Sequence, residues 1–300
     1  MKLYYFKDPK GDFGDDLNPW LFNNLLPGKL KEQSDHLLIG VGTLLNHRIP
    51  DARRVTVFGS GHGYGQLPRI TTNWNFICVR GPLTAKAMNL DENIAITDPA
   101  MLTPLYFTER FSKAYDVSYM PHCDSAQLGD WQFICNLLNI NFIDPRQPFL
   151  KVFEEIQKSK LLITEAMHGA ILADAFRVPW CPVKAYPHIS EFKWQDWLMS
   201  VNSDAQFSYL PSIYRGDELY GFNASLKNKV KRVIVDTVLW NDSWSKPPHA
   251  KSNISTIENC ADELQKIIES KRSFLSSAEL LEQNTERLLE KLQSLRNVHV

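Results

Sequence analysis

The chain has 300 residues, with 33 lysines and arginines against 34 aspartates and glutamates, and 44% of its residues are hydrophobic. This composition is typical of a soluble globular protein, and at roughly 100–200 residues per domain the length predicts two domains. The net charge of −1 argues against a general attraction to nucleic acid, because that binding depends on clustered lysines and arginines that neutralise phosphates.

The N-terminal stretch MKLYYFKDPKGDFGDD lacks the long apolar segment of a signal peptide. No part of the sequence approaches the roughly 18 consecutive apolar residues that a membrane-spanning helix needs. We therefore expect a cytoplasmic protein. The five cysteines are widely spaced and form no C-x-x-C pair, which favours reduced thiols in the cores.

Short apolar runs alternate with helix-like stretches over the first part of the chain, which predicts a parallel sheet with helices on both faces. The expected strands are 3–6, 37–41, 54–58, 76–80 and 94–97, and the expected helices are 18–26, 42–47 and 82–88. A polar and aromatic stretch at 102–115 interrupts the alternation. We place a domain boundary there.

The alternation resumes in the middle of the chain. The expected strands are 117–120, 140–143, 161–164 and 180–183, and the expected helices are 127–138, 148–158 and 168–176. The sequence therefore predicts an α/β fold with two Rossmann-like, doubly wound domains, over residues 1–113 and 114–250. A helical segment is expected at 251–300.

The last segment carries a periodic stripe of mostly apolar residues. Its members follow a 4-3 spacing along one side of a helix: Phe274, Ala278, Leu281, Thr285, Leu288, Leu292 and Leu295. Two interpretations remain open. The helix can pack on the body of the protein, or the stripe can form the seam of a homodimer, although Ala278 and Thr285 fit a seam poorly.

Four glycines at alternate positions follow the predicted strand 54–58, in the run Gly59 to Gly65. Glycine lets the main chain approach a ligand closely, so this loop predicts an anion or sugar site formed by Ser60, Gly61 and His62. The glycine spacing matches neither a dinucleotide fingerprint nor a P-loop. The alternative interpretation is a flexible turn.

The run from Leu161 to Ala170 predicts a buried strand that leads directly into a helix, with Thr164 at the strand end. Open α/β sheets bind ligands at the carboxyl ends of their strands. His168, between Met167 and Gly169 in the first helical turn, is therefore the best-placed general acid or base, and the helix dipole there tends to lower an imidazole pKa. The alternative is a structural histidine. The single E-x-x-H pattern makes no metal site, because sites of that kind need two copies, and we expect no metal.

Three other polar segments follow predicted strands. Arg80 ends one of them, and its guanidinium suits a carboxylate or phosphate, with a salt bridge as the alternative. Asp98 follows the next strand and can bind a ligand or cap a helix. Asp15 and Asn18 belong to a polar loop after the first strand, which can contact sugar hydroxyls or form a simple turn.

The segment from Phe192 to Trp197 carries two indoles among polar neighbours. An indole offers a flat apolar surface and an N–H donor to a sugar ring, so we expect Trp194 or Trp197 to contact an acceptor. The alternative is that both tryptophans fill the interior or a dimer interface.

Taken in chain order, the motifs GDFGDDLNPW, VFGSGH, VRGPLT, TDPAML and LLITEAMHGAILADAFRVPW resemble the polysaccharide pyruvyl transferase family, nearest to bacterial ketal pyruvate transferases that modify exopolysaccharides. The resemblance spans about residues 1–185. It implies a GT-B-like pair of domains and transfer of a pyruvyl group from phosphoenolpyruvate to two hydroxyls of one sugar, with no further cofactor. It also implies that His168 is catalytic and that Arg80 binds the donor.

The candidate residues divide between the two substrates on this interpretation. The donor site comprises Arg80, Ser60, Gly61, Thr164, Met167 and Gly169, and the acceptor site comprises Asp15, Asn18, His62, Asp98, Trp194 and Trp197.

One departure from the family pattern affects the donor site. Many members have Arg-Leu-His where this chain has Ala166-Met167-His168, so an arginine that contacts the donor is missing. Arg177 and Lys184 are candidate substitutes.

The acceptor implied by the resemblance is an oligosaccharide or a lipid-linked saccharide. A basic cluster fits peripheral contact with the inner face of the cytoplasmic membrane: Lys227, Lys229, Lys231 and Arg232. Two rival functions stay open. They are a GT-B glycosyltransferase with a nucleotide-sugar donor and a non-catalytic sugar-binding protein, the latter motivated by the missing arginine.

Overall fold

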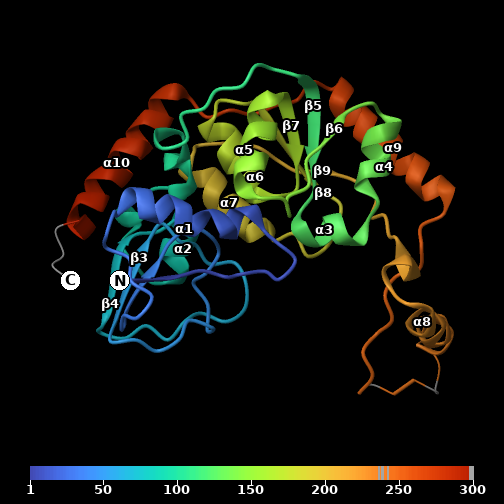
Figure 1. Cartoon of the computed structure of the whole chain (residues 1–300), viewed down its shortest axis with the longest axis horizontal. Coiled ribbons are helices and arrows are strands. Elements are labelled where there is room, and N and C mark those ends of the chain that lie inside the picture. The colour runs from blue at the N-terminus through green and yellow to red at the C-terminus, as the bar shows by residue number, and fades with distance from the viewer. Residues whose placement is uncertain (236, 238–239, 242, 297–300) are drawn as a thin grey trace.

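The computed structural model of the chain describes residues 1–235, 237, 240–241 and 243–296 (Figure 1). It contains two parallel β-sheets with helices packed against them, and the first sheet precedes the second in the chain. The predicted mixed α/β class is therefore confirmed.

The first sheet has four parallel strands that lie side by side in chain order. They are β1 (Lys2–Tyr4), β2 (His36–Ile39), β3 (Arg54–Phe58) and β4 (Trp74–Cys78). Helix α1 (Phe13–Leu25) connects β1 to β2, and α2 (Pro82–Ala87) follows β4. A doubly wound sheet needs a reversal of strand order, so that prediction is wrong for the first half.

Two local differences from the expected elements also occur in the first half. The expected helix at 42–47 is a loop, because Gly42 adopts a φ of +117°, which a helix cannot contain. The expected strand at 94–97 is reduced to one bridge between Val79 and Ala95, after the short 3-10 helix η1 (Glu92–Ile94).

The second sheet has five parallel strands in the order β6-β5-β7-β8-β9. They are β5 (Tyr115–Met120), β6 (Asn141–Phe142), β7 (Ser159–Thr164), β8 (Trp180–Lys184) and β9 (Ser208–Tyr209). The chain starts in the interior at β5, adds β6 on one side and then returns to the other side with β7. This order is that of a doubly wound sheet, and it creates a switch point at the carboxyl ends of β5 and β7.

Helices connect the strands of the second sheet. They are α3 (Cys123–Leu128), α4 (Trp131–Leu137), α5 (Phe149–Lys158), α6 (Met167–Ala175) and α7 (Glu191–Ser200). The single helix expected at 127–138 is thus two short helices, since the chain is extended at Gly129 and Asp130 caps a new start.

One hydrophobic core runs through both halves of the chain. The same cluster of buried side chains includes Leu17 and Phe58 from the first half and Leu162 and Trp194 from the second. The 3-10 helix η2 (Pro99–Leu105) packs on α6, and α7 packs on α2. The two sheets are therefore joined by continuous packing, and the predicted domain limits stay predictions.

The C-terminal part is helical, with α8 (Phe222–Ile234) after the 3-10 helix η3 (Gly216–Leu219), then α9 (Ile254–Glu269) and α10 (Ala278–Arg296). The predicted segment extends to residue 300, and its last four residues, 297–300, lie outside the described part. Of the described helices, none combines the length and apolar character that crossing a membrane requires.

Helix α10 returns to the first half and packs on β4 and η2. Leu288, Leu292 and Leu295 are buried in the shared core. The main part of the predicted stripe therefore faces the body of the same chain. Phe274 precedes the helix and pairs with Trp180 in an isolated bridge. The predicted homodimer stays untested.

A buried ion pair connects the two halves. Arg80, just after β4, places Nε 3.1 Å from Oδ2 of Asp196 on α7, and both side chains are fully buried. The backbone N–H of Thr84 donates to Asp196 Oδ1 at 2.8 Å, and the Thr84 hydroxyl donates to Oδ2 at 2.6 Å. The hydrogen bonds that the Asp196 carboxylate accepts from Arg80 and Thr84 thus all come from the first half.

We expect Arg80→Met to lower the free energy of unfolding by about 3–5 kcal/mol, because it leaves the Asp196 carboxylate buried without its counter-charge. Combining it with Asp196→Asn should recover part of the loss. The exposed pair of Arg215 with Asp130 gives the control, since Arg215→Met should change stability by about 1 kcal/mol or less. Denaturant unfolding measures all three. If Arg80→Met left the free energy of unfolding unchanged but weakened donor binding, Arg80 would be a donor-binding residue as first predicted.

Candidate active site

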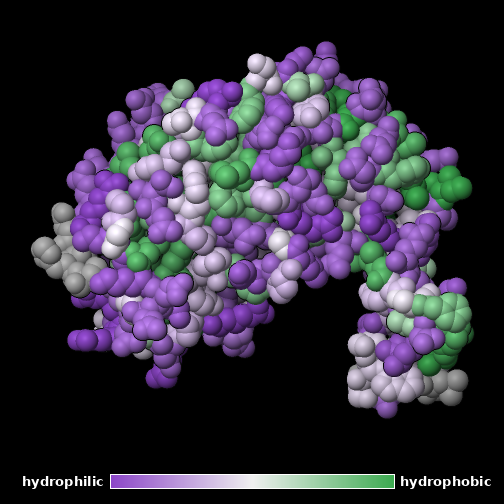
Figure 2. Space-filling model, viewed as in Figure 1, coloured by the Kyte–Doolittle hydropathy of each residue, from purple (hydrophilic) through white to green (hydrophobic). Residues whose placement is uncertain are grey.

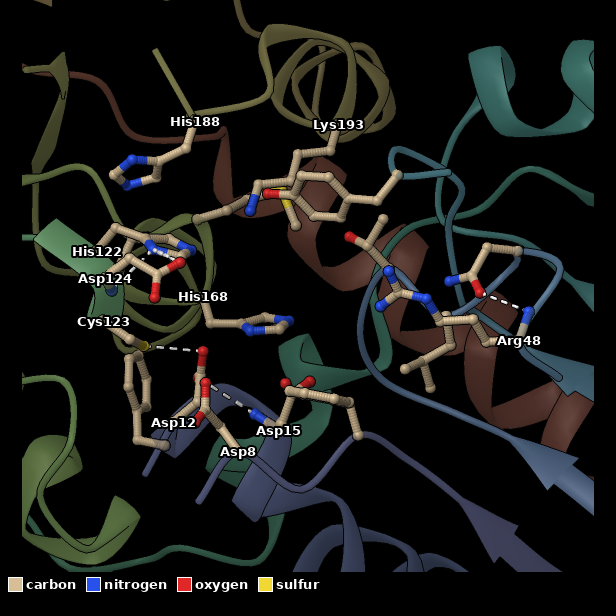
Figure 3. A pocket seen from close by; sticks show the side chains of 18 of the residues that line it. Asp8, Asp12, Asp15, Arg48, His122, Cys123, Asp124, His168, His188 and Lys193 are labelled. Atoms are coloured by element: carbon tan, nitrogen blue, oxygen red, sulfur yellow. Dashed lines mark hydrogen bonds and ion pairs between the residues drawn. The ribbon is translucent and has the colours of Figure 1, made fainter. Parts of the chain in front are cut away.

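A pocket of about 400 Å³ lies where the carboxyl ends of strands from both sheets face each other. Its walls come from the loops after β1, β2, β3, β5, β7 and β8 and from α7 (Figure 3). Its titratable lining side chains include Asp8, Asp12, Asp15, Arg48, His122, Cys123, Asp124, His168, His188 and Lys193. The volume is within the range of small-molecule sites.

His168 stands in the first turn of α6, directly after β7, and its side chain is 13% exposed. Its Nε2 lies 3.8 Å from Oδ2 of Asp98, which is fully buried behind it. The other oxygen of Asp98 accepts the N–H of Ala100 at 2.9 Å and so caps η2. Within the described part of the chain, neither Nε2 nor Oδ2 has a hydrogen-bond partner. The pair can therefore tighten when a proton or ligand arrives.

The charge of Asp98 decides the protonation of His168. Burial alone would lower the pKa of the imidazole, but the carboxylates of Asp98, Asp12 and Asp15 together outweigh it, Asp98 most strongly, and hold the pKa of His168 above its usual value. The helix dipole, which tends to lower an imidazole pKa, therefore does not set the net direction at His168. The result is a histidine suited to carrying and donating a proton near neutral pH.

The first turn of α1 fixes the other side of the imidazole. A Cβ on Gly14 would lie 1.9 Å from Nδ1 of His168, so only glycine permits this contact. The Asp12 carboxylate caps the helix by accepting the Gly14 N–H at 2.8 Å, and it also accepts the Cys123 thiol at 2.9 Å. The helix end and the histidine thus come from different halves and are held against each other.

Asp15, one residue later, lines the same pocket. Its pKa is raised to about 7, first by burial and then by the neighbouring Asp12, while His168 and Lys193 act in the opposite direction. Both the protonated and the ionised form of Asp15 are accessible near neutral pH. It can therefore take up or release a proton beside His168.

Lys193 on α7 supplies the buried cation of the pocket, and the residue is 6% exposed. Its ammonium lies 5.0 Å from the ring centre of Tyr64, and Figure 3 shows it extending between His122 and His168. Among the described residues, no carboxylate lies within ion-pair distance of it. A lysine in this position, without a carboxylate partner among the described residues, is suited to binding an anion.

His122, Asp124 and His188 gather in the part of the pocket near the Lys193 ammonium, with potential ligand atoms within 4.8 Å of one another. Burial lowers the pKa of His122 to about 3 and also lowers that of His188, so both imidazoles are neutral. This donor set fits a divalent cation such as zinc. Sequence spacing did not reveal it, because His188 follows a different strand.

Comparison with known proteins identifies the family of the chain. A family model described as polysaccharide pyruvyl transferase matches residues 11–184, which is more than half of the chain and includes most of the pocket lining. The chain belongs to the polysaccharide pyruvyl transferase family.

Two similar proteins can be named. The succinoglycan biosynthesis protein ExoV of Rhizobium meliloti is 45% identical over 205 residues, which cover 67% of this chain and 65% of that protein, just under two thirds of its length. The crystal structure of an uncharacterised Klebsiella pneumoniae protein aligns over 69% of this chain and 92% of its own, with 16% identity and a TM-score of 0.43. The second likeness supports no argument about function.

The structure places a first group of the predicted family site residues inside or against the pocket. Asp15, Met167 and His168 line it, and Asp98 lies directly behind His168. Ala166, at the position of the missing family arginine, also lines the pocket, and Lys193 is the buried cation nearby.

A second group has structural partners instead of an open face, so we correct their assignment. Arg80 is fully buried against Asp196, and its remaining nitrogens donate to the Thr43 hydroxyl at 2.9 Å and the His62 carbonyl at 3.0 Å. Gly61 is required by that packing, because a Cβ there would lie 2.2 Å from Cζ of Arg80. The sequence could not distinguish a ligand arginine from an interior one.

The loop residues near them are also engaged. Ser60 donates to the Gly42 carbonyl at 3.0 Å, and Asn18 bridges the backbone of Val41 in both directions at 3.0 Å. His62 bonds the Leu45 carbonyl at 2.7 Å.

Thr164 and Gly169 belong to the interior of the β7–α6 turn. The Thr164 hydroxyl accepts the Ala166 N–H at 2.9 Å, and a Cβ on Gly169 would meet the sulfur of Met120 at 2.7 Å. Neither residue lines the pocket, so both support the position of His168 from behind.

The tryptophan prediction is wrong. Trp194 and Trp197 are fully buried and pack around Trp180, because α7 lies between the two halves and is covered on several sides. Of the phenylalanines and tyrosines that line the pocket, Phe6 and Tyr64 are the exposed ones, at 51% and 40%.

The candidate substitutes for the family arginine lie elsewhere. Arg177 donates to the Ser276 carbonyl at 2.6 Å and so ties α6 to the C-terminal segment. Lys184 pairs with Glu191 at 2.5 Å. Neither lines the pocket.

We expect Gly14→Ala to reduce activity by about 100-fold or more, because the added methyl displaces the imidazole of His168 from its position. Gly221→Ala is the matched control, since a Cβ there meets nothing within 4 Å. Turnover and thermal unfolding are measured for both. Full activity in Gly14→Ala would show that this position of the imidazole is not the reactive one.

Proposed function

We propose that this chain transfers a pyruvyl group from phosphoenolpyruvate to two hydroxyls of one sugar in an exopolysaccharide or its repeat unit, forming a cyclic ketal. The observation that carries the proposal is the pairing of His168 and Asp98 in a pocket whose buried cation is Lys193. Membership of the family and the similarity to a succinoglycan biosynthesis protein support the same reaction class.

The donor has a carboxylate and a phosphate, so its site needs positive charge and N–H donors. Lys193 meets one anionic group from α7. The free N–H groups at the start of α6, beside His168, bind the other anionic group of phosphoenolpyruvate. On this assignment Lys193 takes over the role of the arginine that the family carries at the position of Ala166.

His168 acts on the enol of the donor. Transfer of its proton to the methylene carbon of phosphoenolpyruvate converts that carbon to a methyl group and makes the adjacent carbon electrophilic. A sugar hydroxyl then attacks this carbon, and its proton passes to an ionised Asp15 or back to His168. The second hydroxyl then displaces inorganic phosphate and closes the ketal ring, and its proton leaves with the phosphate. The Asp98 carboxylate stabilises the imidazolium before the transfer.

The acceptor approaches from the first half. Phe6 and Tyr64 expose aromatic faces at the pocket, and such faces stack on sugar rings. On this assignment the first half binds the acceptor and the second half binds the donor, as in a GT-B-like arrangement. The reaction then takes place between the carboxyl edges of the two sheets.

The decisive test is release of inorganic phosphate from phosphoenolpyruvate in the presence of a panel of oligosaccharides. We expect release that depends on the acceptor, and His168→Gln should lower it by about 100- to 10,000-fold with the fold intact. Turnover of a nucleotide sugar instead would identify a glycosyltransferase. Sugar binding without turnover of either donor would identify a binding protein.

We expect Lys193→Ala to weaken donor binding by about 10- to 100-fold, because a charge-assisted contact contributes roughly 1.5–3 kcal/mol. Lys184→Ala, a lysine on the neighbouring strand that is paired outside the pocket, should leave donor binding unchanged. Titration calorimetry with phosphoenolpyruvate compares the two variants. Equal affinities would indicate that Arg48 or backbone N–H groups, and not Lys193, bind phosphoenolpyruvate.

We further propose that the reaction requires no metal, because the cationic Lys193 already faces the donor and would repel a divalent ion at the same point. Turnover should therefore survive treatment with EDTA. Loss of activity on chelation, restored by zinc or manganese, would contradict this and would direct attention to His122, Asp124 and His188.

A further inference from the structure

Helix α8 projects away from the body beyond the second sheet (Figure 1). It is anchored through its polar face, which packs on η3. Arg232 pairs there with Asp217, and Asn228 Nδ2 lies 3.3 Å from Oδ1 of the same carboxylate. Lys231 and Arg232 also bond the carbonyls of Ser245 and Pro248, so the described contacts all hold the polar side of the helix and leave its opposite face unpacked.

That opposite face is apolar and exposed. Phe222, Leu226, Val230 and Val233 recur at a spacing that places them on one side of the helix, and they are 83%, 56%, 55% and 77% exposed. Figure 2 shows the corresponding hydrophobic surface on the projecting lobe. A contiguous apolar surface of this kind marks a site of interaction.

The charges of α8 are all of one sign. The helix has four basic residues and no acidic one, although the whole chain has a net charge of −1. At about 3.6 residues per turn, Lys227 and Lys229 fall on the two borders of the apolar face. Lysines in that position extend along apolar surface and keep their ammonium groups in a polar layer.

We propose that α8 lies in the surface of an anionic lipid bilayer. The apolar face enters the boundary of the acyl chains, and Lys227 and Lys229 contact the phosphates of the headgroups. Tyr220 and Trp244, which are 46% and 44% exposed, flank the helix in the sequence and are side chains that favour this interface. A second copy of the chain fits less well, because joining two such faces would bring Lys227 and Lys229 of both copies together, with no acidic residue on the helix to offset their four positive charges.

The test is flotation of the full chain with phosphatidylcholine vesicles, with and without phosphatidylglycerol. We expect binding to the vesicles that contain phosphatidylglycerol and a loss of binding at high salt. Leu226→Asp combined with Val233→Asp should lower binding at least about tenfold. Phe133→Asp combined with Leu137→Asp is the matched control, because these residues of α4 are also exposed, at 47% and 53%, and should not affect binding.

Further variants separate charge from apolar contact. Lys227→Gln with Lys229→Gln should abolish the preference for phosphatidylglycerol and leave phosphate release with a soluble acceptor unchanged. Failure of the unmodified chain to float, or equal binding by the α8 and α4 variants, would overturn the proposal. A dimer that the α8 variant converts to a monomer, without vesicle binding, would instead make this face an interface between copies. Circular dichroism establishes that each variant is folded.

Discussion

The carboxylate of Asp196 holds the two halves of the chain in register. It is fully buried, and the groups that satisfy it, the guanidinium of Arg80 and the backbone and hydroxyl of Thr84, all come from the first half. A buried charge without these donors would be strongly unfavourable, so α7 has one position in which it is stable. Lys193 precedes Asp196 by one turn on the same helix and is therefore delivered into the pocket by that contact. The guanidinium also binds Thr43 and the carbonyl of His62, so it fixes the loops after β2 and β3.

The second half of the fold follows closely from the sequence as far as β8, because its strands and helices have strong local periodicity and short connections. The sequence does not predict α7 and β9, because the stretch after residue 187 has no regular pattern. The position of His168 follows for the same reason, since a buried strand that enters a helix directly can place the residue at the strand end in only one way. The first half departs from expectation where local pattern is weak. The conformation of the loop at 42–47 is set by the positive φ of Gly42 and by the hydrogen bond from the Leu44 N–H to the Ser60 hydroxyl.

The composition of the site could not be predicted at the same level. Arg80 and Asp196 are 116 residues apart in the chain, so nothing local reveals that the arginine already has a partner. Lys193, His122 and His188 meet only through the packing of separate loops, and each alone has an ordinary sequence context. The burial of Trp194 and Trp197 could not be predicted either, because it also depends on contacts between distant parts of the chain. A helix that lies between two halves is covered on faces that would be exposed on a simple surface helix.

The return of α10 to the first half has a consequence for synthesis of the protein. Leu288, Leu292 and Leu295 complete a core whose other members include Leu17 and Phe58, and the guanidinium of Arg296 reaches the carbonyl of Leu25 at 3.1 Å. Residues 278–296 leave the ribosome after every other element described. The first sheet therefore cannot reach its final packing until this helix has been synthesised, so the two halves mature together and not in the order in which they are made.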